Sequence, residues 1–270
     1  MTEERFNAGS FSARVLRCNT AIVGTGAAGY NAADRLWQYG QKDILLITEK
    51  RTAGTSRNTG SDKQTYYKLS LSGDETDSVA EMARTLFAGG AVNGDTALAE
   101  AAGSVRGFMK LVNLGVPFPT TRYGEYAGYK TDHDPRRRAT SAGPLTSRYM
   151  TEALEKSVRS KPIPTLEHWT AIRLLERDGA VQGVLGLDAT RVGEDSHGLS
   201  LIRCHRVILA TGGPAGLYHA SVYPESQSGM TGLALAIGAQ GANLQEWQYG
   251  LASTKFRWNV SGTYQQVLPR

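Results

Sequence analysis

The sequence is poor in the residues that cross-link chains or bind metals. It contains two cysteines, Cys18 and Cys204, which are too few for a disulfide framework. Each stands at the start of an apolar run, so both are expected to be buried, reduced thiols. The five histidines do not have the spacing of metal ligands. Neither a disulfide-stapled fold nor a metal site is therefore expected.

Long apolar runs are also lacking. No run approaches the ~20 residues that a membrane-spanning helix needs. Residues 1–7 lack the basic and apolar segments of a secretory signal. No transmembrane segment is expected, and the default prediction is a cytoplasmic location.

Charge of one sign is not concentrated along the chain, although the formal net charge is +5. The densest basic cluster, Arg136 to Arg138, follows the acids Asp132 and Asp134. No nucleic-acid-binding motif surrounds it. The cluster is interpreted as a solvated or substrate-facing loop, and no nucleic-acid partner is expected.

What the sequence does contain is a glycine turn between a strand pattern and a helix pattern. Residues 19–29 read Asn-Thr-Ala-Ile-Val-Gly-Thr-Gly-Ala-Ala-Gly. In such a turn Gly24 permits the tight bend, Gly26 lets the backbone approach a pyrophosphate, and Gly29 lets the helix pack against the strand. A helix that begins near Ala27 directs its free N–H groups at the anion. The alternative is that these glycines serve packing alone.

A carboxylate follows at the distance that dinucleotide sites use. The apolar segment from Ile44 to Ile47 precedes Glu49, which lies 20 residues after Gly29. A carboxylate there accepts hydrogen bonds from a ribose hydroxyl and repels a 2′-phosphate. The ligand is therefore predicted to be FAD or NAD rather than NADP.

The remaining pattern predicts an α/β protein. Residues 1–17 are aperiodic and are predicted to be an arm or linker, before a strand, a helix and a strand at 18–49. Long loops are predicted at 51–77, where the loop lines a ligand, and at 116–144. Helices are expected at 78–91, 95–113 with Asp95 as its cap, 145–160 and 231–238. Strands are expected at 167–177, 180–189, 199–204 and 206–213. Asp178-Gly179 predicts a hairpin between the first two, and the last is interpreted as a central parallel strand.

Several of these motifs occur in an order that is typical of one family. They are residues 22–29, Glu49-Lys50, residues 56–60, Ala210 to Gly213, and the tail from Gly229 to Tyr249. In this order they resemble the FAD-binding half of the fumarate reductase, succinate dehydrogenase and L-aspartate oxidase flavoproteins. The resemblance begins near Cys18 and covers nearly the whole chain. It implies a glutathione-reductase-like FAD/NAD-binding fold, with a Rossmann-type parallel sheet beside an antiparallel β segment.

The resemblance also implies which residues bind FAD. Those at the pyrophosphate are Gly24, Gly26, Ala27, Ala28 and Gly29. Glu49, followed by Lys50, would bind the adenosine ribose, and the backbone of Ala171 would meet the adenine. The residues that would pass beside the pyrophosphate and isoalloxazine are Ser56, Thr59, Gly60 and Ser61. Those that would close over the cofactor are Ala210, Thr211, Gly212 and Gly213.

The chain departs from its relatives where substrate or flavin chemistry is concerned. Residues 55–63 contain no histidine, which excludes covalent flavin through a histidine of that loop. Residues 248–250 read Gln-Tyr-Gly where dicarboxylate enzymes carry a substrate-binding histidine, so fumarate and succinate are not expected as substrates. The candidate catalytic residues are His133, whose acidic neighbours would raise its pKa, and Arg136. Both could bind an anionic substrate, and a solvated loop is the alternative.

In this family a capping domain follows and supplies the proton-transferring arginine. The chain is therefore expected to be an N-terminal fragment: an arm at 1–17, an incomplete FAD-binding domain at 18–250, and the start of the capping domain at 251–270. The predicted function is a FAD-dependent oxidoreductase that moves a hydride between a small-molecule substrate and flavin N5. An electron-transfer subunit is a candidate partner. The alternatives are an NAD-dependent dehydrogenase and a non-catalytic FAD-binding fragment.

Overall fold

The computed structural model describes residues 1–59, 64–73, 76–131, 134–214, 219, 227 and 229–244. The chain divides into two compact units. The first consists of Met1–Asn58 and Leu154–Gln240, and the second of Thr59–Ala153 and Gly241–Arg270.

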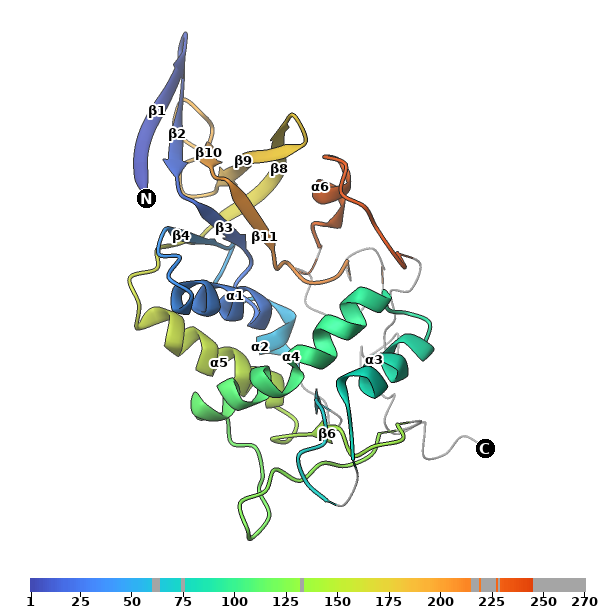
Figure 1. Ribbon diagram of the computed structural model, residues 1–270. Coiled ribbons are helices and arrows are strands. Elements are labelled where there is room, and N and C mark those ends of the chain that lie inside the picture. Colours follow the sequence, from blue (N-terminus) through green and yellow to red (C-terminus); the bar gives the residue numbers. More distant parts are fainter. Residues whose placement is uncertain are drawn as a thin grey trace. The chain divides into compact units, whose positions relative to one another are not determined.

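A four-stranded parallel sheet forms the centre of the first unit (Figure 1). Its order is β11 (Arg206–Leu209), β3 (Thr20–Val23), β4 (Ile44–Ile47) and β7 (Thr165–Leu166). Every residue of β3 and β4 is buried, as expected for apolar strands in the middle of a parallel sheet. Helix α1 (Ala27–Gln38) connects β3 to β4. The predicted α/β class and the opening strand, helix and strand are confirmed.

An antiparallel segment lies beside this sheet. The second sheet has the order β1 (Thr2–Ala8), β2 (Phe11–Arg17), β10 (Leu199–Arg203), β9 (Ala180–Asp188) and β8 (Trp169–Arg177). Asp178 and Gly179 have φ angles of 55° and 76°. Two consecutive positive φ angles are those of a type I′ turn, so the predicted β8–β9 hairpin is confirmed.

Two predictions about strands are wrong. Residues 1–17 are regular rather than aperiodic, because β1 and β2 form a hairpin, and β2 pairs in parallel with β10. Strand β2 buries Ala13, Val15 and Leu16. Strand β11 is the outermost described strand of its sheet rather than a central one. Its residues are accordingly only partly buried or exposed.

The second unit is mainly helical. It contains α3 (Val79–Ala88), α4 (Gly94–Asn113) and a short pair of strands, β5 (Tyr66–Tyr67) and β6 (Ala139–Thr140). The cap of α4 is Asn93, not Asp95 as predicted, since its side chain accepts hydrogen bonds from the N–H groups of Asp95 and Thr96. Two short elements, α2 (Thr55–Asn58) and β5, interrupt the loop predicted at 51–77.

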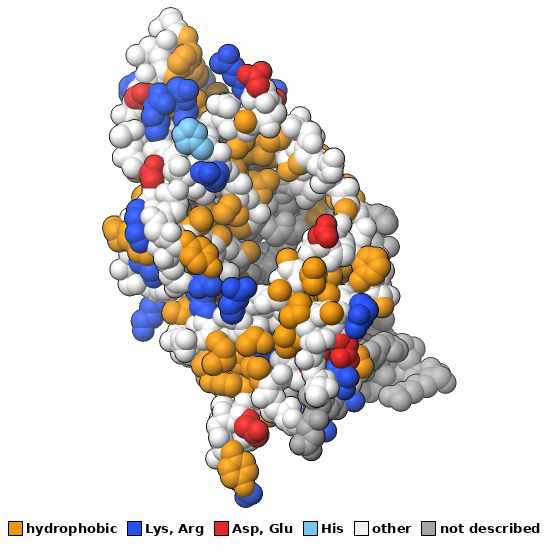
Figure 2. Space-filling model, viewed as in Figure 1, with side chains coloured by type: hydrophobic (Ala, Val, Ile, Leu, Met, Phe, Trp, Pro, Cys, Tyr) orange, Lys and Arg blue, Asp and Glu red, His pale blue; other side chains and the backbone are white. Residues whose placement is uncertain are grey.

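The last two helices agree with prediction. Helix α5 (Thr146–Arg159) runs from the second unit into the first, and α6 (Thr231–Leu235) belongs to the first. Within the described residues, no helix combines the length and apolarity that crossing a bilayer requires. On the face shown in Figure 2, acidic side chains lie among the basic ones, so the described part of that face carries no large patch of one sign.

An aromatic cluster in the second unit surrounds a buried lysine. The ring of Phe108 packs against Tyr66, Phe118 and Tyr126 at centroid distances of 4.7 to 5.6 Å. The ammonium nitrogen of Lys68 lies 4.9 Å from the Phe108 ring centroid, and its side chain is fully buried. Among the described residues, no carboxylate pairs with it. Burial lowers the pKa of Lys68 from its ordinary 10.5 to about 8.

Lys68→Met is expected to stabilise the protein near neutral pH. The folded-state pKa lies below that of the unfolded chain, so keeping the ammonium charged costs free energy at all pH values below about 8. Methionine removes that cost, which we expect to be about 2 kcal/mol at pH 7. The advantage of the variant should shrink as the pH rises from about 8 to 10.5 and then vanish. Denaturant unfolding of both proteins across this range tests it, and a gap that does not change with pH would contradict the titration of Lys68.

Candidate functional site

The glycine turn between β3 and α1 is shaped by close backbone contacts. Gly24 has a φ of 111°, and its N–H donates to the Ile47 carbonyl at 2.8 Å. A Cβ at Gly24 would lie 2.3 Å from the Ala210 carbonyl oxygen, and one at Gly29 would lie 1.9 Å from the Gly24 carbonyl oxygen. Only glycine fits either position. The structural roles predicted for these two glycines are confirmed.

Gly26 has a different environment. It is the N-cap of α1, has a φ of −77° and provides no side chain to cap the helix. The first bond of the helix runs from the Tyr30 N–H to the Gly26 carbonyl, so the N–H groups of Ala27, Ala28 and Gly29 have no acceptor within the helix. A Cβ at Gly26 would meet only the Ser56 hydroxyl, at 3.4 Å. This end of α1 is therefore polar, positive and open to an anion.

Ser56 reaches the same helix end from α2. Its hydroxyl accepts a long hydrogen bond of 3.4 Å from the Ala27 N–H. The neighbouring Arg57 forms an ion pair with Glu155, and both side chains are largely buried. Because this pair anchors α2, the Ser56 hydroxyl is held beside the open N–H groups. Thr59 is assigned to the second unit, and Gly60 and Ser61 lie outside the described residues.

Glu49 stands at the carboxyl end of the adjacent strand β4, followed by Lys50, and both side chains are exposed. A buried hydrogen bond of 2.9 Å between the hydroxyls of Thr25 and Thr48 ties the glycine turn to this strand end. The Thr170 hydroxyl donates to the Glu49 carboxylate at 2.9 Å. The predicted pyrophosphate and ribose positions thus lie at neighbouring strand ends of one sheet, where such folds bind ligands.

The remaining predicted residues approach from two other strands. Ala210 donates its N–H to the Val23 carbonyl at 2.8 Å, and Gly212, between Thr211 and Gly213, has a φ of 74°. Ala171 is buried on β8, where a register shift between Ala171 and Arg173 interrupts the ladder with β9. Ala171 itself pairs with Gly186, and its contact to adenine stays a prediction.

The candidate catalytic residues belong to the second unit. His133 lies outside the described residues. Arg136 donates to both carboxylate oxygens of Glu81, at 2.8 and 3.3 Å. A substrate anion at Arg136 would have to compete with this pair, and a role for Arg136 in catalysis stays a prediction.

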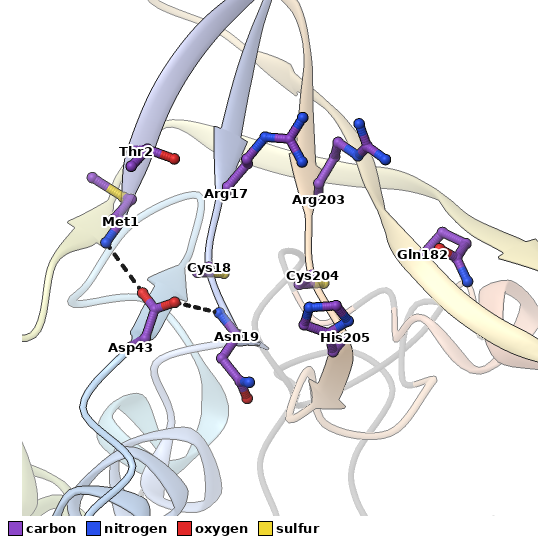
Figure 3. Close-up of a pocket in the computed structure, with 10 residues that line it drawn as sticks. All are labelled: Met1, Thr2, Arg17, Cys18, Asn19, Asp43, Gln182, Arg203, Cys204 and His205. Atoms are coloured by element: carbon purple, nitrogen blue, oxygen red, sulfur yellow. Dashed lines mark hydrogen bonds and ion pairs between the residues drawn. The ribbon is translucent and has the colours of Figure 1, made fainter.

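A cavity of about 300 Å³ lies at the opposite edge of the parallel sheet (Figure 3). Asn19, Asp43 and His205, which line it, immediately precede β3, β4 and β11. Dinucleotides bind at the carboxyl ends of parallel strands, so this cavity at the amino ends is not the predicted site. Cys18 and Cys204 also line it. Burial raises the pKa of Cys18 to about 12 and that of Cys204 to about 11, so both are neutral thiols at pH 7.

Sequence reasoning missed two parts of the site, the Thr25–Thr48 hydrogen bond and Thr170. Thr170 is separated from Glu49 by 121 residues. No local pattern indicates such a contact, because it depends on how β8 is placed beside β4.

The fold and the site together define a dinucleotide-binding domain: a parallel sheet, a glycine turn, an open helix N-terminus and a carboxylate on the next strand. The chain belongs to the FAD-binding domain family, whose model matches residues 19–266. The family assigns FAD as the cofactor, in place of the alternative NAD.

Curated relatives agree with this assignment. An L-aspartate oxidase from Vibrio cholerae is 27% identical over an alignment of 252 residues, and the match covers 86% of this chain and 44% of the relative. One from Mesorhizobium japonicum is 30% identical over an alignment of 234 residues, and the match covers 84% of this chain and 43% of the relative. The chain thus spans less than half the length of the curated relatives it matches.

Solved structures share the fold. A quinol fumarate reductase chain from E. coli superposes with a TM-score of 0.68 and 22% identity, covering 82% of this chain and 37% of that one. Adenylylsulfate reductase from Archaeoglobus fulgidus gives a TM-score of 0.62 and 20% identity, covering 88% and 38%. These structures confirm the fold, and the family model confirms the predicted family resemblance.

Proposed function

We propose that this chain is the FAD-binding part of an oxidoreductase in which non-covalently bound FAD exchanges a hydride with a small-molecule substrate. The observation that carries the proposal is the open end of α1: Gly26 has no side chain, and three N–H groups beside it lack helical acceptors. A diphosphate supplies the negative charge that such a helix end binds. The residues present therefore fit the pyrophosphate of FAD.

The chain's own residues would hold and orient the cofactor. The amides of Ala27 to Gly29 and the Ser56 hydroxyl would bind the pyrophosphate, and Glu49 would accept hydrogen bonds from the ribose. When bound, FAD supplies the ring that accepts or donates a hydride. Since residues 55–63 contain no histidine, the attachment is non-covalent at that loop.

For the substrate and the partner, only the chemical or functional type is proposed. A small anionic substrate is proposed from the basic cluster of residues 136–138, where the anion would compete with Glu81 for Arg136. The similarity to a chain of a Mycobacterium smegmatis Sdh1 complex supports an electron-transfer subunit as partner. A cytoplasmic location stays a prediction. The second candidate function is FAD binding without catalysis, which is favoured by the ion pair between Arg136 and Glu81, because this pair occupies a candidate catalytic side chain.

Flavin binding is the direct test. The purified chain should quench the fluorescence of added FAD with one-to-one stoichiometry, and NADP should not displace it because Glu49 repels the 2′-phosphate. We expect Glu49→Gln, which keeps size but removes the charge, to weaken FAD binding about tenfold. Photoreduction of the bound flavin, followed by reoxidation with candidate acceptors, then separates catalysis from binding alone. Tight binding of NAD with no binding of FAD would contradict the proposal.

A further inference from the structure

We propose that Thr170 is a positioning residue for the Glu49 carboxylate and so sets the affinity of the site for the adenosine ribose. The inference rests on the proposed FAD site and deepens it.

The chain passes from one sheet to the other at His168. Strand β7 ends at Leu166 in the parallel sheet, and β8 begins at Trp169 in the antiparallel sheet. Between them, His168 has a φ of 60°. This left-handed conformation is uncommon for a residue with a side chain and is strained. Such strain persists only where the surroundings fix the backbone, and it occurs preferentially at functional sites.

Three backbone hydrogen bonds fix this crossing. The N–H of His168 donates to the Glu49 carbonyl at 3.0 Å, and the N–H of Trp169 donates to the Thr48 carbonyl at 3.2 Å. On the other side, the N–H of Ala189 donates to the His168 carbonyl at 2.8 Å. The first residues of β8 are therefore attached to the carboxyl end of β4, the strand end that carries Glu49.

Trp169 makes this attachment rigid. Its side chain is 2% exposed, and its indole N–H donates to the Ser200 hydroxyl at 2.5 Å. The ring lies over Gly186, where an added Cβ would approach it to 2.2 Å. A buried, hydrogen-bonded tryptophan with no free space beneath it cannot shift easily, so the neighbouring Thr170 has a fixed place.

The hydroxyl of Thr170 then holds one oxygen of the Glu49 carboxylate, at 2.9 Å. Threonine is suited to this because its branched Cβ restricts χ1. An exposed glutamate is otherwise free to adopt many rotamers, and ordering them upon ligand binding lowers affinity. One carboxylate oxygen accepts from Thr170, while the other keeps its lone pairs for the ribose hydroxyls. Thr170 therefore pre-organises the carboxylate before FAD arrives.

The test compares ligands that carry the ribose with one that does not. FAD binding to the whole 270-residue chain is measured by flavin fluorescence, with ADP and inorganic pyrophosphate as competitors. Thr170→Val should weaken the binding of FAD and of ADP about fivefold and leave the binding of pyrophosphate unchanged, because only the first two ligands contain the ribose. Thr170→Ser, which keeps the hydroxyl, should restore most of the affinity. Thr190→Val is the matched control, since Thr190 donates a similar hydrogen bond to Asp188.

The role of Glu49 is isolated by a double-mutant cycle. If Thr170 acts through Glu49, Thr170→Val should have no further effect on FAD binding in a Glu49→Ala background, which removes the acceptor of the Thr170 hydrogen bond. Three results would overturn the inference while the proposed FAD site stood. They are an equal loss of affinity for all three ligands, additive effects of the two substitutions on FAD binding, and wild-type FAD affinity in Thr170→Val. Absence of FAD binding by the unsubstituted chain would overturn the proposed function and this inference together. Thermal unfolding of each variant confirms that the fold is retained.

Discussion

Gly29→Ala is expected to destabilise the protein by at least about 3 kcal/mol and to abolish FAD binding. The added methyl group would lie 1.9 Å from the Gly24 carbonyl oxygen and 2.9 Å from the Gly24 carbonyl carbon, and these backbone atoms cannot rotate away. Relief requires α1 to move off β3, which disrupts the turn that Gly24 forms. Thermal unfolding followed by circular dichroism should show a melting temperature lower by roughly 10 °C.

Gly103→Ala provides the control for this prediction. Gly103 lies within α4, and an added Cβ there would have no heavy atom within 4 Å. Alanine is the better helix former, so this variant should be as stable as the wild type or slightly more so. Equal melting temperatures for the two glycine variants would show that α1 is not packed against the turn as described.

Gly26→Ala separates the packing role of the turn from its ligand role. Gly26 has an ordinary φ, and a Cβ would approach only the Ser56 hydroxyl, at 3.4 Å. We therefore expect the free energy of unfolding of Gly26→Ala to lie within about 0.5 kcal/mol of that of the wild type. The same methyl group would occupy the space that a pyrophosphate needs beside the free N–H groups, so FAD binding should weaken more than tenfold. An unstable Gly26→Ala variant, or one with unchanged FAD affinity, would contradict this division of roles.

Features that depend on neighbouring residues could be predicted from the sequence. The turn at Gly24 to Gly29 and the hairpin at Asp178-Gly179 each need a particular backbone conformation, and the residues that permit it stand next to one another. The same holds for the helices, whose apolar residues recur with helical spacing. These local requirements were enough to locate the glycine turn and the N-terminal end of α1.

Features that depend on pairing between distant segments could not be predicted. Strand β2 alternates apolar and polar residues only briefly, and its partner β10 lies more than 180 residues later. The place of β11 at the edge of the described part of its sheet follows from strand order, which no single segment encodes. The contact between Thr170 and Glu49 has the same origin. Sequence composition was misleading for Arg138, since a basic cluster usually faces water, whereas this guanidinium is fully buried.

Arg138 forms a buried network with Asp77 in the second unit. Its guanidinium donates to both carboxylate oxygens of Asp77, at 2.7 and 2.9 Å, and to the Thr85 hydroxyl at 2.9 Å. The exposed fractions of the two charged side chains are 0% and 2%. Burial alone would raise the pKa of Asp77, but the hydrogen bonds from Arg138 and from the N–H groups of Ser70 and Ser78 together lower it below its ordinary value.

Arg138→Met is therefore expected to destabilise the protein by about 4 kcal/mol at pH 7, because it leaves the Asp77 carboxylate buried without its partner. The control is Arg148→Met, which breaks an exposed pair with Glu152 and should cost less than about 0.5 kcal/mol. The loss of stability caused by Arg138→Met should also depend on pH. In the wild type, the stabilisation linked to the low pKa of Asp77 is complete above the ordinary aspartate pKa of about 3.9 and is lost as the pH falls further. In the variant, protonation of Asp77 relieves the buried charge. The stability gap measured by urea unfolding should therefore narrow as the pH falls toward about 4 and narrow further below it, and a gap that stays constant would show that Arg138 stabilises the unit by packing rather than by its charge.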